Sequence, residues 1–104
     1  MAEERDVRWP TDDAQQLFRA IRLLKTDEEV EHFFRDLCTM GELEAMSHRW
    51  HAARLLDQGL PYQEISRITG ASTATVTRVA QWLRRGENGY TLILERLKRS
   101  SVKN

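Results

Sequence analysis

Residues 70–79 read GASTATVTRV, and this stretch decides the fold of the chain. Threonine occupies three of the five positions 73–77, and a single arginine stands near the end. Threonine is a mediocre helix former, so its repeated use between two segments of helical apolar spacing needs a reason beyond packing. The composition predicts a glycine turn followed by a helix with an exposed face of small side chains.

The spacing around Gly70 is that of two helices joined by a tight turn. Such a pair needs a small residue where the backbones approach, a glycine where the chain reverses and apolar residues that face the first helix. Ile65 is apolar, Ser66 is small, and Gly70 follows four positions after Ser66. Val76 and Val79 lie six and nine positions beyond the glycine. This spacing matches a helix-turn-helix.

The helix-turn-helix is expected at about residues 61–85, and its second helix has two distinct faces. Apolar residues form the inward stripe: Val76, Val79, Ala80 and Leu83. Small or polar residues are turned outward: Ser72, Thr73, Ala74, Thr77, Arg78 and Gln81. A helix that enters a DNA major groove needs small side chains in its first turns, because bulky ones hold the backbones apart. The pattern therefore favours DNA binding over a capped helix whose threonines only meet solvent.

The outward residues carry chemistry suited to DNA. Threonine hydroxyls can bond bases or phosphates, threonine methyls can touch thymine methyls, and Arg78 can reach a guanine edge or a phosphate. Basic residues around the helix are candidate phosphate contacts: Arg67, Arg84, Arg85, Lys98, Arg99 and Lys103. For Arg84 and Arg85 a structural explanation also holds, since the helix dipole stabilises cations in a last turn.

Helical spacing of apolar residues recurs along the whole chain, and no sustained two-residue alternation indicates a strand. The predicted fold is all-α with six helices. They run from Thr11 through Leu24, from Thr26 to Cys38, from Thr39 to near Gly59, from Pro61 to Gly70, from Ser72 to about Arg85, and from about Tyr90 through Leu97. Thr26 with Glu29, and Thr39 with Glu42, have the spacing of a capping box.

The length of 104 residues predicts a single helical domain, residues 1–104, with flexible ends at about 1–8 and 100–104. The formal net charge is zero, but its distribution is uneven. Residues 1–48 carry 6 Lys/Arg and 12 Asp/Glu, whereas residues 49–104 carry 10 and 4. The second half is therefore basic enough to bind a polyanion.

Several classes of function are disfavoured by the sequence. There is no apolar run of about 20 residues and no signal peptide, which predicts a cytoplasmic protein without a membrane segment. The lone cysteine gives neither an internal disulfide nor a zinc ligand set. His48 and His51 have a metal-ligand spacing but no obvious third ligand. No nucleophile–base motif or phosphate-binding glycine loop is present, so we expect no enzyme activity, metal or cofactor.

Residues 36–86, DLCTMGELEAMSHRWHAARLLDQGLPYQEISRITGASTATVTRVAQWLRRG, resemble the Trp repressor superfamily, and more closely its YerC/YecD-type TrpR-like branch. The tracts TGASTATVTRV and DLCT are the most specific pieces. The resemblance implies a six-helix, intertwined homodimer whose two helix-turn-helix units face successive major grooves. A chain this small with an apolar stripe on every helix independently favours a partner that covers those stripes.

In the Trp repressor, tryptophan is held by two arginines, and by position Arg49 and Arg78 match them. The repressor has glycine where this sequence has Val79, and serine where it has Trp82. Valine and tryptophan at these positions of the ancestral ligand pocket should fill the slot with the protein's own side chains. We therefore expect that tryptophan is not the corepressor, while another small-molecule effector stays open.

The sequence thus predicts a dimeric, sequence-specific, double-stranded DNA-binding transcriptional regulator, with repression favoured over activation. Its operator is expected to be roughly palindromic, with half-sites about one turn apart. Two alternatives stay open: a helical protein-interaction module, and a DNA-binding accessory subunit of a transposase or recombination system.

Overall fold

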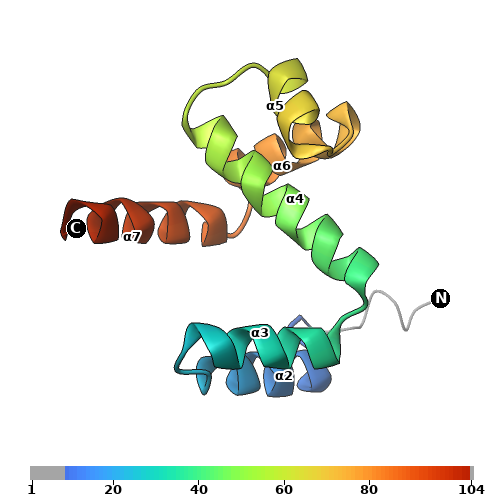
Figure 1. The fold of residues 1–104 in the computed structure, drawn as a ribbon, viewed down its shortest axis with the longest axis vertical. Helices are drawn as coiled ribbons and strands as arrows, with labels where there is room; N and C mark the ends of the chain where they lie inside the picture. The colour runs from blue at the N-terminus through green and yellow to red at the C-terminus, as the bar shows by residue number, and fades with distance from the viewer. Residues whose placement is uncertain (1–8, 104) are drawn as a thin grey trace. The chain divides into compact units, whose positions relative to one another are not determined.

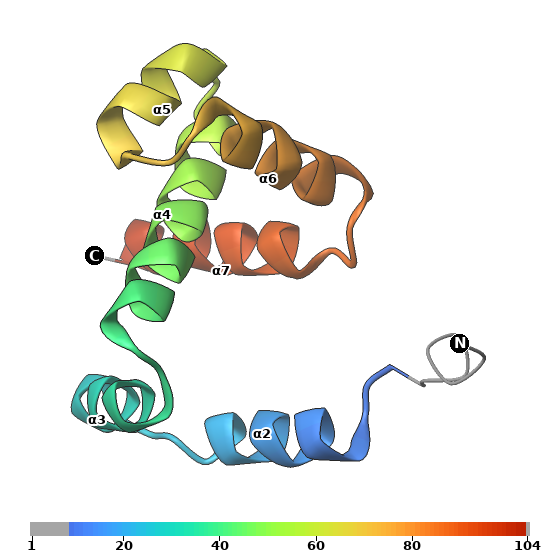
Figure 2. The same ribbon diagram turned by 90° about the vertical axis from the view of Figure 1, so that its right-hand side faces the viewer.

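The structure is a computed structural model that describes residues 9–103, and within this range all regular secondary structure is helical. The predicted all-α class is therefore confirmed. Six helices follow one another in the described range: α2 (Asp12–Arg22), α3 (Asp27–Leu37), α4 (Met40–Asp57), α5 (Tyr62–Thr69), α6 (Thr73–Arg85) and α7 (Gly89–Lys103). The chain divides into two compact units, residues 1–39 and 40–104 (Figures 1 and 2).

The first unit contains α2 and α3, whose starts are fixed by the threonines that the sequence indicated. The Thr11 hydroxyl accepts a hydrogen bond from the Ala14 amide at 3.1 Å, and Thr26 accepts from the Glu29 amide at 3.1 Å. The Glu29 carboxylate accepts in turn from the Lys25 amide at 2.8 Å. Side-chain caps of this kind satisfy amides that have no partner inside the helix.

The second unit is built around α4, against which α5 and α6 pack (Figure 1). Its core contains small or β-branched side chains from α4, α5, the turn and α6: Ala52, Ala53, Ile65, Ala71, Val76 and Val79. Larger half-buried side chains, Trp50 and Tyr90 among them, pack around this core. Two alanines on α4 let the other helices approach its backbone closely, so α6 is held directly on α4.

Hydrogen bonds from two side-chain hydroxyl groups stabilise the turn between α5 and α6. The buried Thr69 hydroxyl donates to the Ile65 carbonyl at 2.8 Å and accepts from the Ala71 amide at 3.1 Å. Ser66 donates from its hydroxyl to the Ala71 carbonyl at 2.6 Å. Gly70, between them, has φ +83°, a left-handed conformation that glycine adopts without steric cost. Both the backbone and two side chains therefore determine the direction in which α6 leaves the turn.

Gly70→Ala is expected to lower the free energy of unfolding by about 1–2 kcal/mol, the cost of a left-handed conformation for an L-residue. The added Cβ would meet only the His48 ring, at 3.5 Å from Cε1 and 3.7 Å from Nε2, which are ordinary contacts, so the backbone accounts for the loss. The matched control is Gly89→Ala at the start of α7, where nothing lies within 4 Å. Urea unfolding of the two variants at one protein concentration measures the difference, and equal losses would contradict this account.

Helix boundaries follow the predicted ones with small shifts. Pro61 is the residue before α5 and not part of its first turn, and α7 begins at Gly89. The α7 backbone continues to Lys103, through most of the stretch 100–104 that the sequence predicts to fray. The other predicted flexible end, residues 1–8, lies outside the described residues, as does Asn104.

Candidate nucleic-acid interface

The outward face of α6 lies on the surface, as the spacing predicts. Six residues that were assigned to this face are exposed: Ser72, Thr73, Ala74, Thr77, Arg78 and Gln81. Val76, Val79 and Ala80 are buried on the opposite side, and Leu83 is half-buried. The first two turns of α6 are therefore accessible to a large ligand and carry no side chain bulkier than threonine on their outer face, except Arg78.

Two hydroxyl groups on this face already have hydrogen-bond partners. Ser72 caps α6: its Oγ accepts from the Thr75 amide at 3.1 Å and donates to Thr75 Oγ1 at 3.1 Å. Thr77 donates from Oγ1 to the Thr73 carbonyl at 2.9 Å, the back-bond that threonine often forms in helices. Because of these contacts, the Ser72 and Thr77 hydroxyls have less hydrogen-bonding capacity left for a ligand.

The segment that contains α5 and α6 carries a net positive charge. Residues 61–86 contain four arginines and one glutamate, a net charge of +3. Arg78 and Arg85 are exposed and form no ion pair within residues 9–103. The Arg84 guanidinium donates to the Tyr62 hydroxyl at 3.4 Å, which ties the end of α6 to the start of α5. The exposed arginines give this surface a field that attracts polyanions.

Arg67 differs from the other arginines because it is paired with Glu64, one turn earlier on α5. The hydrogen bond and charge of Arg67 lower the pKa of the Glu64 carboxyl, and the same contacts with Glu64 raise the pKa of Arg67. Both side chains face solvent, with exposed fractions of 70% for Arg67 and 44% for Glu64. Glu64 takes the Nε and Nη2 side of the guanidinium, which leaves fewer of the Arg67 donors for a phosphate.

The basic residues of α7 are also exposed where they are described. Lys98 Nζ lies 3.1 Å from Asp57 Oδ2 and so forms an ion pair that joins α7 to the end of α4. Arg99 has no ion pair within the described residues. The side chain of Lys103 lies outside the part of the chain whose side chains are described. Lys98 is therefore already paired with a carboxylate of its own chain, whereas Arg78 is not.

A small pocket of about 240 Å³ lies beside the start of α6. Residues from α4, the turn and α6 line it: Ala45, His48, Arg49, Gly70, Ala71, Ser72 and Thr75. Arg49 and His48 are half-buried on α4 and bring a guanidinium and an imidazole close to the start of α6. Arg49 is one of the two arginines assigned to the ancestral ligand pocket, but Arg78 does not line this cavity.

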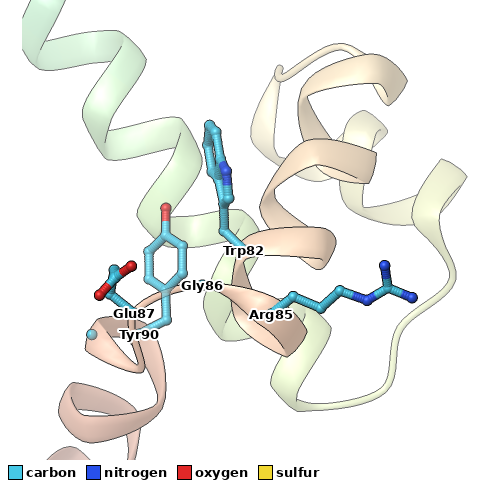
Figure 3. Close-up of a pocket in the computed structure, with 6 residues that line it drawn as sticks. Trp82, Arg85, Gly86, Glu87 and Tyr90 are labelled. Carbon is cyan, nitrogen blue, oxygen red and sulfur yellow. The ribbon is translucent and has the colours of Figure 1, made fainter. Parts of the chain in front are cut away.

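The other two residues assigned to that pocket, Val79 and Trp82, differ in how far they are buried. Val79 is fully buried in the core, where the sequence places it. Trp82 is 46% exposed in the single chain, so it does not fill an internal slot. It lines an open pocket of about 640 Å³ at the junction of α6 and α7, beside Tyr90 (Figure 3). Arg85 extends away from the two rings (Figure 3), and Trp50 stacks on Tyr90 with ring centroids 6.1 Å apart.

Three features of the site were not foreseen from the sequence. They are the buried Thr69 hydroxyl, the Ser66 bond to the turn and the Glu64–Arg67 pair. The three-residue spacing of Glu64 and Arg67 is a recognisable signal for an ion pair on a helix. Thr69 gives only a weak signal, because a polar residue before a turn glycine is as readily exposed as buried.

Within the described residues, no group of three or more His, Cys, Asp or Glu side chains is placed to hold a metal ion. In this part of the chain, none of the helices combines the length and the apolar character that crossing a membrane requires.

The sequence and the fold of the chain have clear relatives. The sequence profile of the Trp repressor protein family matches residues 12–98, and the chain belongs to this family. It is 42% identical over 89 residues to YerC, an uncharacterized protein of Bacillus subtilis (strain 168), with 86% of each chain covered.

Two solved structures are similar to the chain over most of its length. One is a TrpR-like protein from Eubacterium eligens ATCC 27750, with a TM-score of 0.82, 42% identity, and 86% of this chain and 92% of that chain covered. The other is a proposed Trp repressor from Staphylococcus aureus, with a TM-score of 0.79, 42% identity, and 83% and 86% covered. The family resemblance expected from residues 36–86 is thus confirmed.

Proposed function

We propose that the protein is a sequence-specific, double-stranded DNA-binding transcriptional regulator that acts as a repressor by occluding its operator. The observation that carries this proposal is the outer face of α6: small exposed side chains in its first two turns, with Arg78 and Gln81 beside them. Such a helix fits a major groove, and α5 would cross the backbone as the first helix of a helix-turn-helix.

The surrounding charges support the same assignment. Arg67 and Arg84 flank the exposed face on α5 and at the end of α6, where they would contact phosphates. Membership of the Trp repressor family agrees with a regulator of this kind. No catalytic role is assigned to any side chain of the interface, and the proposal needs no cofactor.

We further propose that the regulator is a homodimer. Neither α2 nor α3 buries any residue within the single chain. Large apolar side chains on or next to them are 41–74% exposed: Phe18, Leu23, Val30 and Leu37. Apolar area of this amount on two amphipathic helices favours association, and a second copy would cover it. Two recognition helices in one dimer would read a roughly palindromic operator.

Free tryptophan is expected to leave the protein unchanged, because the Val79 side chain is fully buried in the core at the position that glycine keeps open in the Trp repressor. Thermal unfolding in millimolar L-tryptophan should give the same midpoint as in buffer, and DNA affinity should not change. A ligand that binds only the folded state raises the midpoint with concentration. A concentration-dependent rise would therefore contradict this expectation.

The proposal is tested by selecting duplexes from a random pool with the purified protein, followed by affinity measurements at several salt concentrations. Enrichment of one palindromic sequence supports it. The logarithm of the association constant should fall linearly with the logarithm of salt concentration, since phosphate contacts release counterions. A protein-interaction module would enrich no sequence and show no such slope. Genome neighbourhood distinguishes a regulator from an accessory subunit of a recombination system.

A further inference from the structure

We propose that the first two turns of α6 recognise thymine in the operator through its 5-methyl group, with the methyl groups of Ala74 and Thr77 as the reading surface. This inference rests on the proposed DNA-binding function and names the base chemistry that the same face selects. Ala74 and Thr77 are both exposed and lie three positions apart on α6, which places them on one side of the helix.

The hydrogen bond of Thr77 determines which base edges its side chain can read. Its hydroxyl hydrogen points to the Thr73 carbonyl oxygen, with 2.9 Å between the two oxygens. A hydroxyl in that state can accept a hydrogen bond but cannot donate one. The Thr77 hydroxyl therefore cannot donate a hydrogen bond to guanine N7 and O6, adenine N7 or thymine O4, which are all acceptors. The methyl group of Thr77 has no such restriction.

Ser72 is restricted in a similar way, since its hydroxyl both donates to and accepts from Thr75. It acts as the cap of α6 and has no hydroxyl hydrogen left for a phosphate. Ala74 has no hydrogen-bonding side chain at all. Within this part of the face, Thr73 is the one residue with a hydroxyl for which no hydrogen bond is found among the described residues, and it lies at the first position of the helix.

The face is thus divided by chemistry. Ala74 and Thr77 present methyl groups, whereas Thr73, Arg78 and Gln81 carry the hydrogen-bond donors that can reach base edges. The major-groove edge of thymine is the one base edge that carries a methyl group. Methyl-to-methyl contact in the groove removes apolar surface from water, whereas cytosine has only a hydrogen at C5 and an amino group where thymine has O4.

The test uses the duplex that the protein itself selects from the random pool, and a second duplex in which every thymine is replaced by deoxyuridine. The replacement removes only the 5-methyl groups and keeps all hydrogen-bonding groups. Wild-type protein should bind the deoxyuridine duplex about three- to fivefold more weakly for each buried methyl group that is lost, the affinity equivalent of one buried methylene-sized group.

Two variants of Thr77 separate its methyl group from its hydroxyl. Thr77→Val keeps a methyl at the same place and removes the hydroxyl, so its affinity ratio between the thymine and deoxyuridine duplexes should equal that of wild type, even where the loss of the bond to the Thr73 carbonyl changes both affinities. Thr77→Ser keeps the hydroxyl and removes the methyl, so it should bind the thymine duplex three- to fivefold more weakly and distinguish less between the two duplexes. Circular dichroism melting curves verify that both variants fold.

Equal wild-type affinity for the two duplexes would overturn the inference, as would loss of the affinity ratio in Thr77→Val together with its retention in Thr77→Ser. These failures differ from failure of the proposed function. If the pool yields no enriched duplex at all, the DNA-binding assignment itself is wrong. If a duplex is enriched but its methyl groups have no effect, the protein binds DNA and reads it by other groups.

Discussion

Replacing Ile65 by alanine is expected to lower the free energy of unfolding by about 2–5 kcal/mol. Ile65 is fully buried at the centre of the second unit, packed in one cluster with Ala52, Ala53, Val76 and Val79. The substitution removes three carbon atoms. The cavity that remains lies between α4, α5 and α6, which pack too closely to close it completely. A loss of this size is a large fraction of the stability of a small domain, typically about 5–15 kcal/mol.

Ile68 on the same helix provides the matched control, because it is 42% exposed and lies outside the buried core. Ile68→Ala should lower the free energy of unfolding by about 1 kcal/mol or less. Urea unfolding of both variants is compared at one protein concentration, since association couples stability to concentration. Similar losses in the two variants would show that α5 does not pack as described.

The second large effect is expected for Arg78→Ala in DNA binding. Arg78 is exposed on the outer face of α6 and has no ion pair within the described residues, so its guanidinium is available to a guanine edge. A bidentate contact of this type contributes about 1–3 kcal/mol of discrimination, roughly fivefold to 150-fold in affinity for the selected duplex. Base preference should relax at one position of each half-site, which a repeated selection with the variant measures.

Arg84→Ala is the control for this prediction. Arg84 stands in the last turn of the same helix, and we expect it to contact a phosphate. Its loss should weaken binding to all duplexes alike and reduce the salt dependence by about one counterion. If Arg78→Ala binds the selected duplex as tightly as wild type does, the outer face of α6 is not the surface that reads DNA. Uniform weakening would instead place Arg78 on the phosphate backbone.

The fold could be predicted from the sequence because its signals are local and independent of one another. Thr11, Thr26 and Ser72 are good capping residues, and each accepts a hydrogen bond from the amide three positions on. Gly70 occupies a left-handed turn that few other residues tolerate. Apolar spacing then places Ile65 and the inward residues of α6 in the core. These features lie within a few residues of one another, where sequence patterns are most informative.

The site was harder to predict because its chemistry depends on side-chain rotamers. Exposure of Thr77 follows from helical periodicity, but the direction of its hydroxyl does not, since threonine in a helix can adopt two rotamers. The pairing of Arg67 with Glu64 likewise depends on the rotamers of both side chains, although their three-residue spacing allows it. Trp82 shows a further limit: its position in the sequence suggested a filled slot, and in the single chain it lines an open pocket. Contact of these residues with DNA stays a prediction.

The two adjacent alanines of α4 have a consequence for the evolution of specificity. Ala52 and Ala53 are both fully buried beneath α5 and α6, and each contributes only a methyl group to the contact. Any larger residue there would push α6 outward, because a close-packed interior has no spare volume to absorb it. Under the proposed function, operator preference can therefore drift through changes at buried positions of α4 that contact no nucleotide.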